Sequence, residues 1–211
     1  MREKLGSCVG SYLETLFRVA SEAECTGAAG ERMTLDDACA RVCNLCHDSH
    51  DGGGKIMFIG NGGSMGIAAH MAVDFSKNGS LRSMAFGDSA VLTCLSNDFG
   101  YHDVFARQIE WHGNALDVLM AISSSGESPN ILKGVRAAGL KGSRVVTFSG
   151  FREDNPLRRM GDVNFYVRAK EYGFVELAHQ SLLHAMLDLD RGWKPNRQPQ
   201  TPRVLRRVAH G

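Results

Sequence analysis

Apolar residues recur every three or four positions in two stretches at the start of the chain, residues 2–25 and residues 34 to about 50. In the first stretch Val9, Leu13 and Leu16 belong to this pattern, and in the second Leu35 and Val42 do. A repeat of three to four residues is typical of amphipathic helices. Two helices are therefore predicted to open the chain.

After Asp51-Gly-Gly-Gly54 the pattern changes to short apolar runs that are bounded by glycine or polar clusters. Such runs indicate buried strands, and helical patterns lie between them. The alternation predicts an α/β fold with a doubly wound, parallel sheet of five strands and right-handed crossovers. The predicted strands are residues 55–59, 83–86, 118–122, 144–148 and 163–167, and the predicted helices are 66–75, 90–95, 104–111, 130–140 and 174–189.

Composition fits one globular domain and narrows the classes of partner. The chain has 211 residues, 43% of them apolar and 22% charged, which is ordinary for a folded protein and argues against disorder. A net charge of +1 gives no overall basic field for nucleic acid, and no apolar run is long enough to span a membrane. We predict a single domain over residues 1–190, and a basic, partly extended tail over 191–211.

The six cysteines suggest a reducing compartment rather than a disulfide framework. The first residues, Met1-Arg-Glu-Lys-Leu-Gly, carry no apolar signal segment, so we expect a cytoplasmic protein with free thiols. Cys43-Asn-Leu-Cys46-His47 matches a haem-attachment pattern, and with His50 it would also supply four zinc ligands. However, the cysteines recur at helical spacing, which favours small core residues on one face of a helix.

Glycines cluster where the first predicted strand of the sheet meets a helix. Gly60-Asn61-Gly62-Gly63-Ser64 follows the strand directly, and the helix follows it. Backbone N–H groups and the helix dipole bind anions at such a turn. Met65 stands where a dinucleotide-binding fingerprint needs its third glycine, and no GxxxxGK[ST] occurs, so neither NAD nor a P-loop nucleotide is favoured.

A second turn of the same kind is rich in hydroxyl groups. Ser123-Ser124-Ser125-Gly126-Glu127-Ser128 ends the third predicted strand of the sheet, and Pro129 marks a helix start that Ser128 would cap. A serine-rich surface turn would look the same in isolation. Because the two turns share the carboxyl edge of a parallel sheet, a phosphomonoester bound between them is the better interpretation.

Four separated motifs resemble the sugar isomerase (SIS) domain and, within it, the phosphoheptose isomerase family. They are the glycine turn, Asn97-Asp98-Phe-Gly100, Phe105-Ala-Arg107 and the serine turn, and the likeness extends from about residue 33 to 190. The resemblance implies a flavodoxin-like three-layer sandwich behind two leading helices. It also implies a phosphorylated heptose as substrate, and a homotetramer with its sites at subunit interfaces, without nucleic acid or membrane partners.

The resemblance also implies the site residues. Members of the family carry a histidine and a glutamate four residues apart, then a glutamine and a histidine eight apart, and some bind zinc with all four. These positions are His70, Asp74, Glu176 and His184 here, so aspartate replaces glutamate and glutamate replaces glutamine. The expected catalytic residues are Asp74, Glu176 and His184. The expected substrate-binding residues are Asn61, Gly62, Gly63, Ser64, Asn97, Asp98, Ser123, Ser124, Ser125 and Ser128.

Helical geometry bears on these roles. His70 and Asp74 are four residues apart and share a helix face, whereas Glu176 and His184 are separated by about 12 Å of helical rise. One ion could contact both only if the helix were broken or two subunits contributed. We hypothesise that Glu176 takes over part of the proton transfer, while Asp74 holds a metal or orients His70. Core roles for both histidines, and an ordinary turn at Asn97-Asp98, stay open as alternatives.

The leading function is thus an aldose–ketose isomerase that interconverts sedoheptulose 7-phosphate and D-glycero-D-manno-heptose 7-phosphate through an enediol. The main alternative is a non-catalytic protein of the same fold, either a sugar-phosphate sensor or a replication-initiator-associating protein. The altered acid–base positions and the basic tail motivate it. An isomerase for another phosphosugar is a third candidate.

Overall fold

The computed structural model describes residues 8–195 and has a mixed, seven-stranded sheet at its centre. The strand order is β2-β1-β7-β6-β5-β3-β4, and the five strands from β3 to β7 are parallel to one another. All five coincide with predicted strands to within two residues. The strands are β1 (Glu24–Gly27), β2 (Arg32–Met33), β3 (Ile56–Ile59), β4 (Ser83–Ala85), β5 (Val118–Ser123), β6 (Arg144–Ser149) and β7 (Val163–Tyr166).

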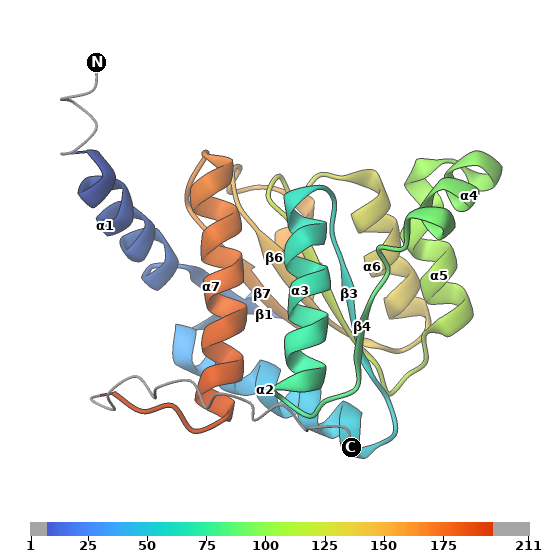
Figure 1. Ribbon diagram of the computed structural model, residues 1–211, viewed down its shortest axis with the longest axis horizontal. Coiled ribbons are helices and arrows are strands. Elements are labelled where there is room, and N and C mark those ends of the chain that lie inside the picture. The colour runs from blue at the N-terminus through green and yellow to red at the C-terminus, as the bar shows by residue number, and fades with distance from the viewer. Residues whose placement is uncertain (1–7, 196–211) are drawn as a thin grey trace, which may run out of the picture.

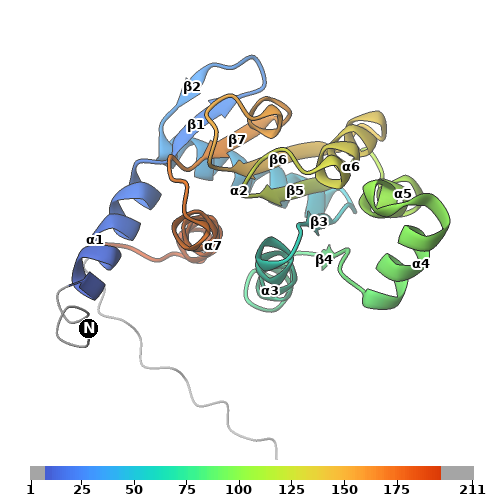
Figure 2. The same cartoon turned by 90° about the horizontal axis from the view of Figure 1, so that it is seen from above.

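Helices cover both faces of the sheet, so the predicted doubly wound, three-layer architecture is confirmed (Figures 1 and 2). One core lies between the sheet and α2, α3 and α7, and the other between the sheet and α4, α5 and α6. The helices are α1 (Cys8–Ser21), α2 (Leu35–Asp51), α3 (Gly63–Lys77), α4 (Ser89–Phe99), α5 (Val104–His112), α6 (Pro129–Leu140) and α7 (Tyr172–Asp190), with 3-10 turns η1 (Tyr101–Asp103) and η2 (Pro156–Arg159).

The prediction of five strands was two strands short. Residues 24 and 25, assigned to the first helix from the sequence, lie in β1, which pairs antiparallel with both β2 and β7 at the edge of the sheet. Strands of four and two residues are too short to show a repeat of their own. The pairing of β1 with β7, more than 130 residues away, and of β2 with β1 is what makes them strands.

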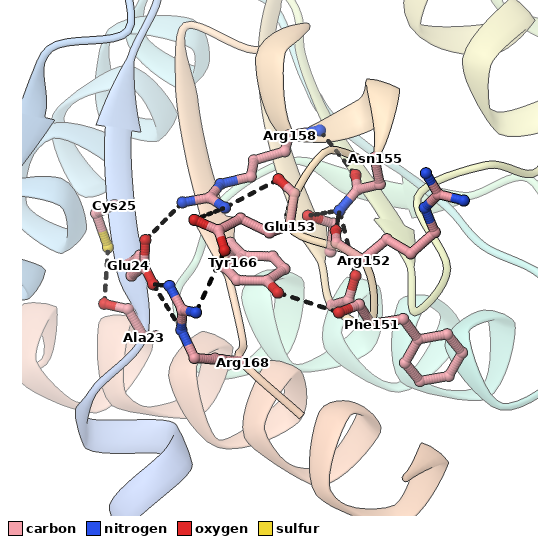
Figure 3. A network of polar contacts seen from close by, with 12 residues as sticks. Ala23, Glu24, Cys25, Phe151, Arg152, Glu153, Asn155, Arg158, Tyr166 and Arg168 are labelled. Carbon is pink, nitrogen blue, oxygen red and sulfur yellow. Dashed lines mark hydrogen bonds and ion pairs between the residues drawn. The ribbon is translucent and has the colours of Figure 1, made fainter. Parts of the chain in front are cut away.

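A network of charged side chains fastens this edge to the β6–β7 connection (Figure 3). Glu24 accepts hydrogen bonds from Arg158 at 2.6 Å and from Arg168 at 2.6 Å. Burial alone would raise the pKa of the Glu24 carboxyl group. The hydrogen bonds from Arg168 and Arg158 have a larger combined effect in the opposite direction, so this pKa lies below its ordinary value. The Arg158 guanidinium also lies 4.0 Å from the centre of the Tyr166 ring. The edge hairpin is thereby held by cationic groups from the far end of the chain.

The first two helices differ in how they contact the sheet. Helix α2 begins after Thr34, whose hydroxyl accepts the Asp37 N–H at 3.1 Å, and its cysteines Cys39 and Cys46 are buried in the core. Burial raises the pKa of the Cys39 thiol to about 12. The interpretation of these two cysteines as core residues is confirmed. Helix α1 packs mainly on α7 and extends away from the sheet (Figure 1).

Two sequence expectations fall largely outside the described residues. Most of the basic tail, residues 196–211, is not described, nor is the start of the first predicted helix, residues 1–7. Within residues 8–195, no helix combines the length and the hydropathy that a membrane span requires.

Candidate functional site

The glycine turn and the serine turn leave neighbouring strands at the same edge of the sheet. β3 and β5 pair in parallel, so the segments that follow Ile59 and Ser123 lie side by side. Gly62 precedes helix α3 with φ of 53°, a left-handed conformation that favours glycine, and no side chain caps the helix. The first N–H groups of α3 are therefore available to an anion at the positive end of the helix dipole.

The serine turn is folded by its own hydrogen bonds. Gly126, with φ of 63°, donates its N–H to the Ser123 carbonyl at 3.0 Å, which closes the turn. Ser128 occupies the position before helix α6 as predicted, but its side chain does not cap the helix. Its hydroxyl lies 3.4 Å from the Ser123 hydroxyl instead. Two hydroxyl groups thus lie together beside the start of α6.

The two turns enclose an open pocket of about 240 Å³. The Ser124 hydroxyl is buried there, and it has no hydrogen-bond partner in the described part of the chain. A buried hydroxyl usually has a hydrogen-bond partner, so this one marks the pocket as a candidate ligand site. All the predicted substrate-binding residues except Asn97 and Asp98 line the pocket, together with Tyr172 and Glu176: they are Asn61, Gly62, Gly63, Ser64, Ser123, Ser124, Ser125 and Ser128.

Asn97 and Asp98 lie away from the pocket lining, at the exposed end of α4. The Asn97 amide donates to the Asp98 carboxylate at 2.9 Å. Within one copy of the chain this pair does not join the other predicted residues, so its role in substrate binding stays a prediction.

Glu176 places a carboxylate at the mouth of the glycine turn. A Cβ atom added to Gly63 would lie 2.5 to 2.7 Å from the Glu176 carboxyl group, so a glycine at position 63 leaves the space that this carboxyl group fills. Glu176 is half-buried on α7 and lines the pocket. The carboxylate therefore lies against the N-terminus of α3, where the helix dipole favours negative charge.

The remaining predicted catalytic and metal residues form a separate cluster between α3 and α7. The Asp74 Oδ2 atom lies 3.4 Å from His70 Nε2 and 3.8 Å from His184 Nδ1, and Asn78 donates to Asp74 Oδ1 at 3.2 Å. The two imidazole rings are 5.3 Å apart. One ligand atom from each of the three residues lies within 4.8 Å of the others.

This donor set fits a zinc ion. Ligands bound tetrahedrally at about 2.0–2.1 Å lie about 3.3 Å apart, close to the two separations measured from Asp74 Oδ2. Two histidines and one carboxylate, with a fourth position open, are typical of catalytic zinc sites. Glu176, the fourth predicted ligand, is not part of the cluster. The two turns of helix between Glu176 and His184 account for its absence, as the helical rise predicts.

Tyr172 is a pocket residue that sequence reasoning missed. It is exposed at the first position of α7, and its ring contacts Phe151 edge to face with ring centres 4.9 Å apart. Phe151 has φ of 55°, which is rare for an aromatic residue, and its carbonyl accepts the Tyr166 hydroxyl at 3.1 Å. No sequence motif marks either residue, because their contact depends on how the β6–β7 connection meets α7.

His179 is a fully buried residue of α7. Its Nε2 atom lies 3.1 Å from the carbonyl oxygen of Ser149, the last residue of β6. Burial lowers the pKa of His179 to about 4 from an ordinary 6.5, and the bond to Ser149 opposes part of that shift. Between these pH values the unfolded chain binds the proton and the folded chain does not. The neutral imidazole therefore contributes stability that is complete above pH 6.5 and is lost as the pH falls toward 4.

We expect the free energy of unfolding to fall by about 3 kcal/mol between pH 6.5 and pH 4 because of His179 alone. Urea unfolding at several pH values measures this slope. In a His179→Met variant, the free energy of unfolding should fall by about 3 kcal/mol less over the same pH range. The stability of this variant at pH 7 will also change. Equal slopes for the variant and the original chain would contradict the prediction.

A larger cavity, of about 620 Å³, lies beside the charged network of Figure 3 rather than at this site. The two arginines that line it form ion pairs: Arg152 with Asp154 at 2.8 Å, and Arg168 with Glu24 and Glu153. Both arginines are thus paired with carboxylates, whereas the Ser124 hydroxyl has no hydrogen-bond partner among residues 8–195. The pocket between the two turns is therefore the better candidate site.

Known proteins are similar to this chain in sequence and in fold. Residues 28–150 match the SIS domain family. A phosphoheptose isomerase of Yersinia pestis (strain Pestoides F) is 35% identical over 161 residues, which span 72% of this chain and 82% of that protein. The structure of phosphoheptose isomerase from Neisseria gonorrhoeae superposes with a TM-score of 0.76 at 30% identity, over 88% of this chain and 99% of that one. A phosphoheptose isomerase from Francisella tularensis gives 0.74 at 27% identity, over 88% and 97%.

Proposed function

The chain belongs to the SIS domain family and, within it, to the phosphoheptose isomerases, and from this membership we propose that it converts sedoheptulose 7-phosphate to D-glycero-D-manno-heptose 7-phosphate. The observation that carries the proposal is the pocket between the glycine and serine turns, with its unpartnered Ser124 hydroxyl. Serine hydroxyls and the free N–H groups of α3 would hold the phosphate there, so the near-neutral chain needs no cationic patch.

Isomerisation moves a proton from C1 of the ketose to C2 through an enediol, while a hydroxyl proton passes between the two oxygens. A carboxylate or imidazole must take the carbon-bound proton and return it to the neighbouring carbon. Glu176 is the carboxylate among the residues that line the pocket, and Asp74 and His184 lie two turns further along the α3–α7 contact. We assign proton transfer to Glu176 and leave Asp74 and His184 to hold a metal ion with His70.

We also propose that His70, Asp74 and His184 hold a zinc ion, because their donor atoms all lie within 4.8 Å of one another and their residue types are those of zinc ligands. When bound, zinc would supply a Lewis acid at the α3–α7 contact. Asn78 orients Asp74 by donating to its other oxygen, which leaves Oδ2 directed at the two histidines.

Replacing His70 or His184 by alanine is expected to reduce the bound zinc from about one ion per chain to none, because a site with two ligands left binds weakly. Elemental analysis after gel filtration measures the metal content without reference to activity. The matched control is His102→Ala, since His102 is an exposed histidine outside the cluster, paired with Asp103. Unchanged zinc content in both cluster variants would exclude the proposed site.

We further propose that the protein is a homotetramer in the cytoplasm. Helix α1 exposes Val9, Leu13 and Phe17, which are 57%, 56% and 75% accessible and lie at four-residue intervals on one helix face. A homotetramer that covers this face, with sites completed at subunit interfaces, would have four times the mass of the chain in light scattering. The thiols of five cysteines are free, which supports a reducing cytoplasm; they are Cys25, Cys39, Cys43, Cys46 and Cys94.

The direct test is an assay with sedoheptulose 7-phosphate, run with and without a chelator, beside calorimetric binding of the same compound. Turnover that a chelator abolishes and zinc restores supports both proposals. Binding without turnover would favour a sugar-phosphate sensor, and turnover of a different phosphosugar alone would favour another isomerase. Neither binding nor turnover would reject the assignment.

A further inference from the structure

The Asn61 side chain in the glycine turn is held by a reciprocal pair of amide hydrogen bonds. Asn61 Nδ2 donates to Asn130 Oδ1 at 2.9 Å, and Asn130 Nδ2 donates to Asn61 Oδ1 at 2.8 Å. Asn130 follows Pro129 in the first turn of α6 and is 2% exposed. The pair therefore joins the two turns that enclose the pocket.

The orientation of both amides is determined by their neighbours. The Ile131 N–H, which can only donate, bonds to Asn130 Oδ1 at 3.0 Å, so this oxygen cannot exchange places with the amide nitrogen. The reciprocal pairing then fixes which end of Asn61 faces Asn130. The Tyr101 hydroxyl, from η1, adds a bond to Asn61 Oδ1 at 2.9 Å.

These contacts leave Asn61 with one group to offer a ligand. Its Oδ1 accepts two hydrogen bonds, and one Nδ2 hydrogen is donated to Asn130, so within the described residues one Nδ2 hydrogen has no partner. Asn61 lines the pocket. It thus presents a donor rather than an acceptor, which suits a carbonyl, enediolate or phosphate oxygen.

We infer that Asn130 and Tyr101 are positioning residues that hold Asn61 as a hydrogen-bond donor to an oxygen atom of the substrate. The inference rests on the proposed function and adds to it the polarity of the recognised group. Asn97 and Asp98 lie at the end of α4, and η1 follows directly. The bond from Tyr101 therefore connects this part of the chain to the pocket.

Asn130→Asp tests the orientation with almost no change in size. A carboxylate cannot donate to Asn61 Oδ1 and repels it, so the reciprocal pair is broken and the Asn61 amide loses its fixed orientation. We expect kcat/KM for sedoheptulose 7-phosphate to fall by about 10- to 100-fold, as when a buried hydrogen bond is lost. Tyr101→Phe, which removes one exposed hydroxyl and leaves the fold in place, should cost about 2- to 5-fold.

A double-mutant cycle separates positioning from a structural role. In an Asn61→Ala background, Asn130→Asp and Tyr101→Phe are expected to cause no further loss of kcat/KM, because they act through the Asn61 amide. Losses that multiply in the double variants, or single variants with unchanged kcat/KM, would overturn the inference. If the original chain neither binds nor converts the sugar phosphate, the proposed function fails, and the inference is rejected with it.

Discussion

Replacing Glu176 by glutamine is expected to lower kcat for sedoheptulose 7-phosphate by about 10²- to 10⁴-fold, the range for loss of a general base. Glutamine has the same size and can fill the space above Gly63, so the pocket should keep its shape. It cannot accept a proton from carbon. A change in kcat with little change in KM would therefore report on the chemistry and not on binding.

The control for this variant is Glu127→Gln. Glu127 belongs to the serine turn, but it is exposed, lies 3.6 Å from Arg152 and does not line the pocket. We expect it to keep kcat within about twofold, as is usual for surface changes away from a site. The family pattern has glutamine at the position of Glu176. Full activity of Glu176→Gln would contradict the assignment of proton transfer to Glu176.

Replacing Gly60 by alanine is expected to destabilise the fold by about 3 kcal/mol, the upper part of the range for overpacking. The added Cβ would lie 2.5 Å from the backbone carbonyl carbon and oxygen of Ser64, and 2.9 Å from the Met65 nitrogen. These are backbone atoms, which cannot rotate away as a side chain can. Relief of the clash would shift the start of α3, so phosphate binding should weaken as well.

Urea unfolding measures the effect of Gly60→Ala, with Gly66→Ala as the matched control. Gly66 lies inside α3, and a Cβ there would have no heavy atom within 4 Å. Alanine at position 66 should stabilise the chain by about 0.5–1 kcal/mol through its higher helix propensity. A Gly60→Ala protein as stable as the original would contradict the close packing between the glycine turn and the N-terminus of α3.

The sequence was sufficient to predict the parts of the site that lie at the ends of strands. Ser123 and Ser124 end an unbroken buried strand, and Gly60 follows another, so a parallel sheet brings them to one edge. His70 and Asp74 were placed on one helix face by their spacing alone. Their partner His184 was assigned through the family resemblance, and the structure places it 3.8 Å from Asp74.

Other features depended on contacts between distant segments, which local patterns do not contain. The hairpin of β1 and β2 is too short for a repeat and is held by β7 and the two arginines that bind Glu24. Tyr172 lines the pocket and contacts Phe151. No sequence motif predicts the left-handed backbone conformation of Phe151. Glu176 lies against the glycine turn rather than with the histidines, because two turns of α7 separate positions 176 and 184.

By itself, the sequence determined the layered α/β fold, the two turns at the edge of the sheet and the chemistry that those turns favour. These depend on the repeat of apolar residues and on glycines and serines at strand ends, which are local properties. Only the tertiary structure decided which side chains meet: Asn61 with Asn130 and Tyr101, and His70 and Asp74 with His184. The reason is physical, because each of these contacts joins helices or loops whose relative positions are set by packing on the sheet.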